Sequence, residues 1–96
     1  MRININHSER FSVLFESVTG QNLHQPVTGI VTDSRECQKG DLYVALSGKR
    51  VDGHGFLPVV TEQGASAALV SRVNEELNIQ QVLVEDPLMT IGTMGH

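Results

Sequence analysis

Apolar residues near the start of the chain recur at the spacing of one helical face. Four of them occupy positions i, i+3, i+4 and i+7, namely Phe11, Leu14, Phe15 and Val18. This spacing is typical of a helix that buries one side. Ser8 is a residue type that caps helices, and Gly20 is one that ends them. The pattern therefore predicts a first helix between these two residues.

Four short apolar runs predict strands, at residues 27–32, 42–46, 67–71 and 81–85. A helix over 56–64 fits between the second and third runs, with Pro58 in its first turn, where a missing N–H costs nothing. A helical turn over 73–78 and a last helix beginning at Asp86–Pro87 complete the order α-β-β-α-β-β-α. We expect an α/β fold: a small sheet of about four strands, helices packed on it, and a βαβ unit at its centre.

Composition narrows the class of protein. A chain of 96 residues with 40% apolar and 19% charged residues suits one globular domain. A net charge of −4 with seven scattered Lys and Arg residues disfavours nucleic-acid binding. No apolar stretch reaches the length of about 20 residues that crosses a bilayer, so we expect no membrane insertion. The single cysteine, Cys37, allows no internal disulfide, which favours a cytoplasmic protein.

Several catalytic motifs are missing from the sequence. There is no G-x-x-x-x-G-K-[ST] phosphate loop and no G-x-G-x-x-G fingerprint. The four histidines and the one cysteine lack the spacing of metal ligands. We therefore expect neither a catalytic residue nor a metal site within this chain.

A first polar motif, residues 32–35, follows the first predicted strand, where α/β sheets open their pockets. Asp33 and Ser34 can bond to backbone N–H groups and fix a turn. Arg35 can pair with Asp33 or Asp41, or face an anionic ligand. Two interpretations remain open at this point: a strand-ending turn with a surface ion pair, or one wall of a binding pocket.

A second polar motif, residues 48–56, contains three glycines, which allow close approach of a ligand to the backbone. Lys49 and Arg50 form the only adjacent pair of positive charges. Asp52 and His54 lie just before a predicted helix, where anions are favoured. The motif suits a phosphate or a nucleotide, and it equally suits a surface loop before a capped helix.

Taken together, these motifs resemble a known family. The runs 29–35, 39–46, 52–56 and 64–65, together with Gly48, look like the N-terminal domain of the Mur ligases, and the likeness covers roughly residues 27–94. Mur ligases are bacterial enzymes that add amino acids to the UDP-linked precursor of peptidoglycan. Stretches 48–54, 68–72 and 81–86 look closer to the subfamily that adds D-alanyl-D-alanine than to the one that adds diaminopimelate or lysine. Tyr43 replaces a more usual Phe, and Pro87 stands where a small residue is expected.

The resemblance implies a site for the UDP moiety of the substrate. The implied contacts are Thr32, Ser34, Lys49, Arg50 and Val51, and the implied loop-shaping residues are Asp33, Arg35, Asp52 and Gly53. It also implies that residues 1–96 are one substrate-binding domain, with the ATP- and Mg-binding domain and the C-terminal domain absent from this chain. The expected partners are UDP-N-acetylmuramoyl-peptide and those further domains, in a monomer. Two other possibilities are a free-standing nucleotide-binding module and an interaction module.

Overall fold

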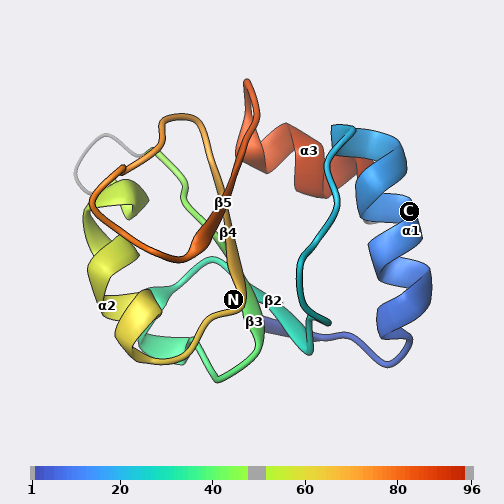
Figure 1. Cartoon of the computed structure of the whole chain (residues 1–96), viewed down its shortest axis with the longest axis horizontal. Coiled ribbons are helices and arrows are strands. Elements are labelled where there is room, and N and C mark those ends of the chain that lie inside the picture. Colours follow the sequence, from blue (N-terminus) through green and yellow to red (C-terminus); the bar gives the residue numbers. More distant parts are fainter. Residues whose placement is uncertain (1, 48–51, 95–96) are drawn as a thin grey trace.

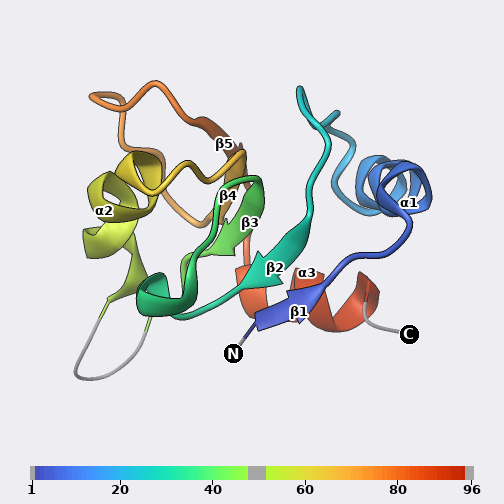
Figure 2. The same cartoon turned by 90° about the horizontal axis from the view of Figure 1, so that it is seen from below.

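A five-stranded sheet forms the centre of the protein in a computed structural model that describes residues 2–47 and 52–94. The strands lie side by side in chain order (Figure 2): β1 (Arg2–Asn4), β2 (Gly29–Val31), β3 (Asp41–Val44), β4 (Ala67–Val70) and β5 (Gln80–Leu83). β1 is antiparallel to β2, and the other neighbours are parallel. The α/β class is confirmed. The sheet gains one strand, β1, over the four runs that the sequence predicted.

The predicted βαβ unit is confirmed between β3 and β4. These strands pair in parallel, with Leu42 opposite Ala67, and helix α2 (Leu57–Glu62) connects them. Pro58 lies in the first turn of α2, as expected. A short 3-10 helix, η2 (Gly53–Phe56), precedes α2, so helical structure starts before the predicted boundary.

Helix α1 (Ser8–Thr19) ends where the sequence predicts. Gly20 adopts a φ of 73°, a left-handed conformation that glycine tolerates best, and its N–H donates to the Glu16 carbonyl at 2.8 Å. The cap at the other end is His7 rather than Ser8, and it makes no side-chain capping bond.

Helices cover both faces of the sheet (Figure 1). α1 and α3 (Pro87–Met94) pack on one face, where Phe15 of α1 joins a buried cluster with Val27, Leu42, Val44, Ala67, Leu69 and Val82. α2 packs on the other face, where its Leu57 and Val60 join a buried cluster with Val31, Cys37, Tyr43, Ala45, Ala68 and Val70. Residues 42 to 45 of β3 and its continuation alternate between the two clusters because successive side chains of a strand point to opposite faces.

The segment between β4 and β5 contains no helix in the structure, contrary to the helical turn expected over residues 73–78. A side chain of β5 is hydrogen-bonded to the backbone of this segment. Gln81 accepts a hydrogen bond from the Asn74 N–H at 2.8 Å and donates to the Asn74 carbonyl at 2.7 Å. The Leu77 N–H donates to the same Asn74 carbonyl at 3.3 Å, so residues 74–77 form a single turn that is bonded to β5 and does not continue as a helix.

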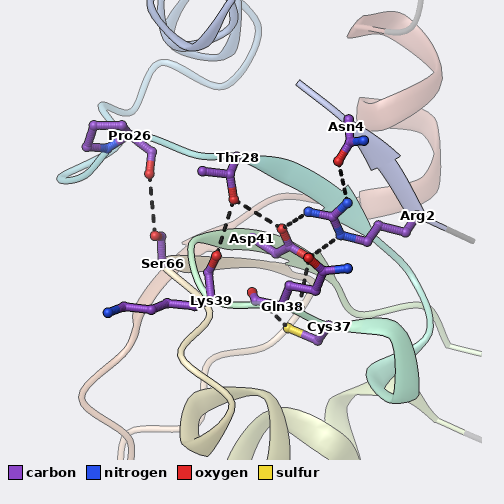
Figure 3. Close-up of polar contacts among 9 residues, drawn as sticks. All are labelled: Arg2, Asn4, Pro26, Thr28, Cys37, Gln38, Lys39, Asp41 and Ser66. Carbon is purple, nitrogen blue, oxygen red and sulfur yellow. Dashed lines mark hydrogen bonds and ion pairs between the residues drawn. The ribbon is translucent and has the colours of Figure 1, made fainter. Parts of the chain in front are cut away.

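A buried carboxylate joins three strands at the amino end of β3 (Figure 3). Asp41 is fully buried, and Arg2 of β1 reaches it across β2 with two hydrogen bonds of 2.8 Å each. The Gln38 N–H adds a third bond at 2.9 Å. A Cβ on Gly29 would lie 2.7 Å from the Arg2 guanidinium, so the crossing requires glycine at that position. β1 is held by this pair as well as by its pairing with β2.

Candidate functional site

The carboxyl ends of the parallel strands carry most of the residues that the sequence singled out. β2 leads into Thr32 and Asp33, β3 leads toward Asp52, and β4 leads into Ser71 and Arg72. Parallel strands end at the same edge of a sheet, and ligands of α/β proteins bind at that edge. The two polar motifs are therefore neighbours in space, because β2 and β3 pair directly.

The first motif forms a tight turn closed by its own aspartate. Asp33 accepts from the Arg35 N–H at 2.9 Å and from the Arg35 guanidinium at 2.8 Å, and the 3-10 helix η1 (Ser34–Glu36) follows. The guanidinium, followed by the backbone bond, lowers the pKa of Asp33 to about 2. Arg35 pairs with Asp33 and not with Asp41, and its side chain is 88% exposed. Ser34 is buried at the centre of the turn.

The second motif repeats this arrangement. Asp52 accepts from the His54 N–H at 3.0 Å and contacts the His54 Nδ1 at 2.8 Å. It too caps a 3-10 helix, with φ and ψ of −102° and 116° against −106° and 118° at Asp33. In both turns an aspartate binds the backbone and the side chain of the residue two positions later. The sequence carries this signal as Asp33-Ser34-Arg35 and Asp52-Gly53-His54.

Gly53 lies against the end of β3. Its N–H donates to the Leu46 carbonyl at 2.7 Å, and its carbonyl accepts from the Tyr43 hydroxyl at 2.8 Å. A Cβ at this position would lie 2.8 Å from the Leu46 nitrogen and 3.0 Å from the Tyr43 hydroxyl. The close approach, rather than an unusual φ, explains why the turn uses glycine.

The Tyr43 hydroxyl lies near both turns. Burial, followed by the electrostatic effect of the nearby Asp33, Cys37 and Asp52, raises the pKa of Tyr43 to about 12. The structure thus brings Asp33 and Asp52, which are 19 positions apart, around one buried hydroxyl. Sequence reasoning missed Tyr43 as a member of the site because its apolar neighbours identified it only as core.

A second strand also holds the Asp52 turn. Arg72, which follows β4, binds the other carboxylate oxygen of Asp52. This ion pair, together with the two His54 bonds, lowers the pKa of Asp52 well below its usual range. His54 is itself buried and contacts Ser71 through Nε2. Ser71 and Arg72 were not singled out by the sequence, and His54 was noted only as a member of the second motif and not as an implied contact.

The expected contacts therefore divide into two groups. Thr32 and Ser34 lie at the carboxyl edge of the sheet, together with the expected loop-shaping residues Asp33, Arg35, Asp52 and Gly53. Lys49, Arg50 and Val51 fall outside the described residues. Ser47 and Asp52 flank that segment and pair with each other as an antiparallel bridge.

Two hollows adjoin the turns. One, of about 320 Å³, lies beside the ends of β3 and β4 and is lined by Ser47, Ser71, Glu85 and Asp86. Its carboxylates disfavour a diphosphate there. The other, of about 510 Å³, lies beside His54 and combines Arg72 with Glu75 and Glu76. Charge alone therefore assigns neither hollow to an anionic ligand.

The described residues form neither a metal-binding cluster nor a membrane-spanning helix. Within 2–47 and 52–94, no group of three His, Cys, Asp or Glu side chains could hold a metal ion. Over the same residues, no helix has the length and apolar character needed to cross a membrane.

Comparison with known proteins places these features in a family. The model described as "Mur ligase family, catalytic domain" matches residues 26–89. A UDP-N-acetylmuramoyl-L-alanyl-D-glutamate--L-lysine ligase of Staphylococcus epidermidis is 37% identical over 90 residues, which are 88% of this chain and 18% of that protein. A UDP-N-acetylmuramoyl-tripeptide--D-alanyl-D-alanine ligase of Synechocystis is 40% identical over 75 residues, which are 76% of this chain and 16% of that protein.

Solved structures agree. MurF from Acinetobacter baumannii superposes with a TM-score of 0.76 at 30% identity, over 88% of this chain and 20% of that one. The MurF ligase of Thermotoga maritima, solved in complex with ADP, superposes with a TM-score of 0.62 at 34% identity, over 68% of this chain and 15% of that one. The chain thus spans about a fifth or less of the length of the relatives that it matches.

Proposed function

The chain belongs to the Mur ligase family, and on that premise we propose that it is the domain that binds the UDP end of a UDP-N-acetylmuramoyl-peptide. The observation that carries the proposal is the pair of aspartate-closed turns at the carboxyl edge of the sheet. Both are held by hydrogen bonds before any ligand arrives. A preformed turn lowers the ordering cost of binding a flexible nucleotide.

Within this proposal the residues have distinct roles. Thr32 and Ser34 supply hydroxyls for the uracil or ribose, and Lys49, Arg50 and Val51 act in the adjoining loop. Asp33, Arg35, Asp52 and Gly53 shape the two turns rather than contact the ligand. Their bonds within the turns support this division, since both carboxylates are already occupied by protein donors.

The activity of the whole enzyme follows as a further proposal. It would be an ATP-dependent amide-forming ligase of peptidoglycan synthesis in the cytoplasm, acting as a monomer. ATP and Mg²⁺ would bind in another domain of the longer protein. That a relative was solved in complex with ADP supports the use of an adenine nucleotide. The gene should therefore continue past codon 96 into a Gly-Thr-x-Gly-Lys-Thr-type loop. A stop codon at 97 would instead support the free-standing module.

The added group is proposed to be D-alanyl-D-alanine, in line with the MurF superpositions. Addition of the third residue, lysine or diaminopimelate, is the alternative, which the longer alignment to the lysine-adding relative favours. Assaying the full-length enzyme with each amine and its matching UDP-muramoyl-peptide distinguishes the two. Turnover with lysine alone would reject the first choice.

An amide-resolved NMR titration of the 96-residue chain tests the binding proposal. UDP should produce saturable shifts around residues 32–35 and 52–54, and ADP should bind more weakly. Replacing Ser34 with Ala should weaken UDP binding by about 1 kcal/mol, or roughly fivefold in Kd, if its hydroxyl contacts the ligand. A folded chain that shows no UDP-dependent shift would contradict the proposal.

A further inference from the structure

The imidazole of His54 connects two parts of the site that are far apart in sequence. It is 6% exposed, and both ring nitrogens are engaged. Nδ1 lies 2.8 Å from the Asp52 Oδ1, within its own turn. Nε2 lies 3.0 Å from the backbone nitrogen of Ser71 and 3.2 Å from the Ser71 hydroxyl, at the end of β4.

These contacts fix the proton on the ring. A backbone N–H can only donate, so the Nε2 that faces Ser71 must carry a lone pair. The ring proton is then on Nδ1, where it donates to the Asp52 carboxylate. A doubly protonated ring would place two N–H groups against each other at Ser71. The geometry assigns the neutral Nδ1–H tautomer.

The ring therefore joins the ends of two neighbouring strands. β3 leads into the Asp52 turn, β4 leads into Ser71, and the two strands pair in parallel. Tyr43 holds the same turn from inside the sheet, through the Gly53 carbonyl. Arg72 also links the turn to the end of β4, through its ion pair with Asp52, but its side chain is 63% exposed. His54 is buried, so it is the link that is better shielded from water.

We propose that His54 is a positioning residue for the UDP site, which fixes the Asp52–Gly53 turn to the carboxyl end of β4 without touching the ligand. The inference rests on the proposed function. A turn built around glycine samples many conformations when it is unanchored, and the anchor removes that freedom before binding. Losing either contact should weaken UDP binding in a folded protein.

Two variants each keep one of the contacts. His54→Gln places an amide oxygen near the position of Nε2, so it can still accept from Ser71 while losing Asp52. His54→Asn places an amide N–H near the position of Nδ1, so it can still donate to Asp52 while losing Ser71. Positioning predicts that each raises the Kd for UDP about fivefold and shifts the amide signals of residues 52–53. Binding equal to the unchanged chain in both variants overturns the proposal.

Arg2→Gln is the control, because it loosens the pair with Asp41 at the opposite edge of the sheet. It should lower stability and leave the Kd for UDP unchanged in the folded protein. An equal loss of UDP affinity in the control would mean that general destabilisation explains the His54 variants, and it would overturn positioning. Failure of the unchanged chain to bind UDP overturns the proposed function together with this inference.

Two measurements on the unchanged chain decide the matter even if the variants do not fold. Nitrogen-15 spectra of the imidazole should show Nδ1 protonated and Nε2 unprotonated; a protonated Nε2 overturns the assignment. Saturating UDP should slow the hydrogen exchange of the Ser71 amide, because coupling between the turn and β4 is reciprocal. Exchange that stays the same at saturation contradicts the coupling.

Discussion

Asp41 and Asp52 are both bound by an arginine, yet they lie at opposite ends of the parallel strands and differ in burial. The Asp41 side chain is fully buried, and that of Asp52 is 37% exposed. Arg2 joins the first to an edge strand, whereas Arg72 and His54 join the second to the end of β4. The bonds around Asp41 are buried, as expected of a structural anchor. Those around Asp52 are partly exposed, as access for a ligand requires.

The difference shows that an aspartate–arginine pair has a different role when it is buried than when it is exposed. Burial raises the pKa of Asp41, but the bonds from Arg2 and from the Gln38 N–H outweigh it and leave the pKa below its ordinary value. The carboxylate therefore stays charged within the protein, and removing its partner would be costly. At Asp52, water screens the ion pair with Arg72, so the pair sets the shape of the turn more than the stability of the fold.

The largest expected effect comes from Asp41→Asn. The change removes the negative charge opposite Arg2. It also replaces the carboxylate oxygen that accepts from the Gln38 N–H with an amide NH₂ group or a weaker amide oxygen. The free energy of unfolding should fall by about 3 kcal/mol. Urea denaturation followed by circular dichroism measures this loss.

Asp52→Asn is the matched change at the other edge. It should destabilise the fold less than Asp41→Asn does, and it should weaken UDP binding more. Reversal of that order, in either stability or affinity, would remove the distinction between anchor and site.

The sequence predicts the elements that have strong local signals. The periodicity around Phe15 and the left-handed stop at Gly20 define α1, and the β-branched runs define the core strands. Strand β1 has three residues, of which only Ile3 is apolar, so no pattern could reveal it. The contacts that hold it are long-range: its pairing with β2 and the bond from Arg2 to Asp41, 39 positions away.

The site divides in the same way. The Asp33 turn was predictable because its bonds span two residues. The role of His54 was not, because its partner Ser71 lies 17 positions away and only the pairing of β3 with β4 brings them together. Near Asn74, residues 74–77 form a single turn whose backbone is bonded by Gln81 of β5, a contact that the local sequence pattern does not reveal.

A smaller effect is expected from Tyr43→Phe, which restores the residue type that the family resemblance leads one to expect. The change keeps the buried ring and removes only the bond to the Gly53 carbonyl. Stability should fall by about 1 kcal/mol. Proton–nitrogen spectra should show shifts concentrated at residues 53–54. Changes that reach α1 instead would indicate a rearranged core rather than a loosened turn.

The smallest effect on stability is expected from Arg35→Gln, because an exposed ion pair adds little to folding. Its signature is the titration of Asp33, whose pKa is about 2 beside the guanidinium. A folded-state pKa below the ordinary value of about 4 means that Asp33 stabilises the protein above that pH and loses this contribution as the pH falls toward 2. In the variant, the pKa should rise but stay below its ordinary value, because the N–H of residue 35 still donates to the carboxylate. Carbon-13 titration of the carboxyl group measures the change. An unchanged pKa would mean that the backbone bond alone closes this turn. Asp33 would then differ from Asp52, whose pKa is lowered most by Arg72.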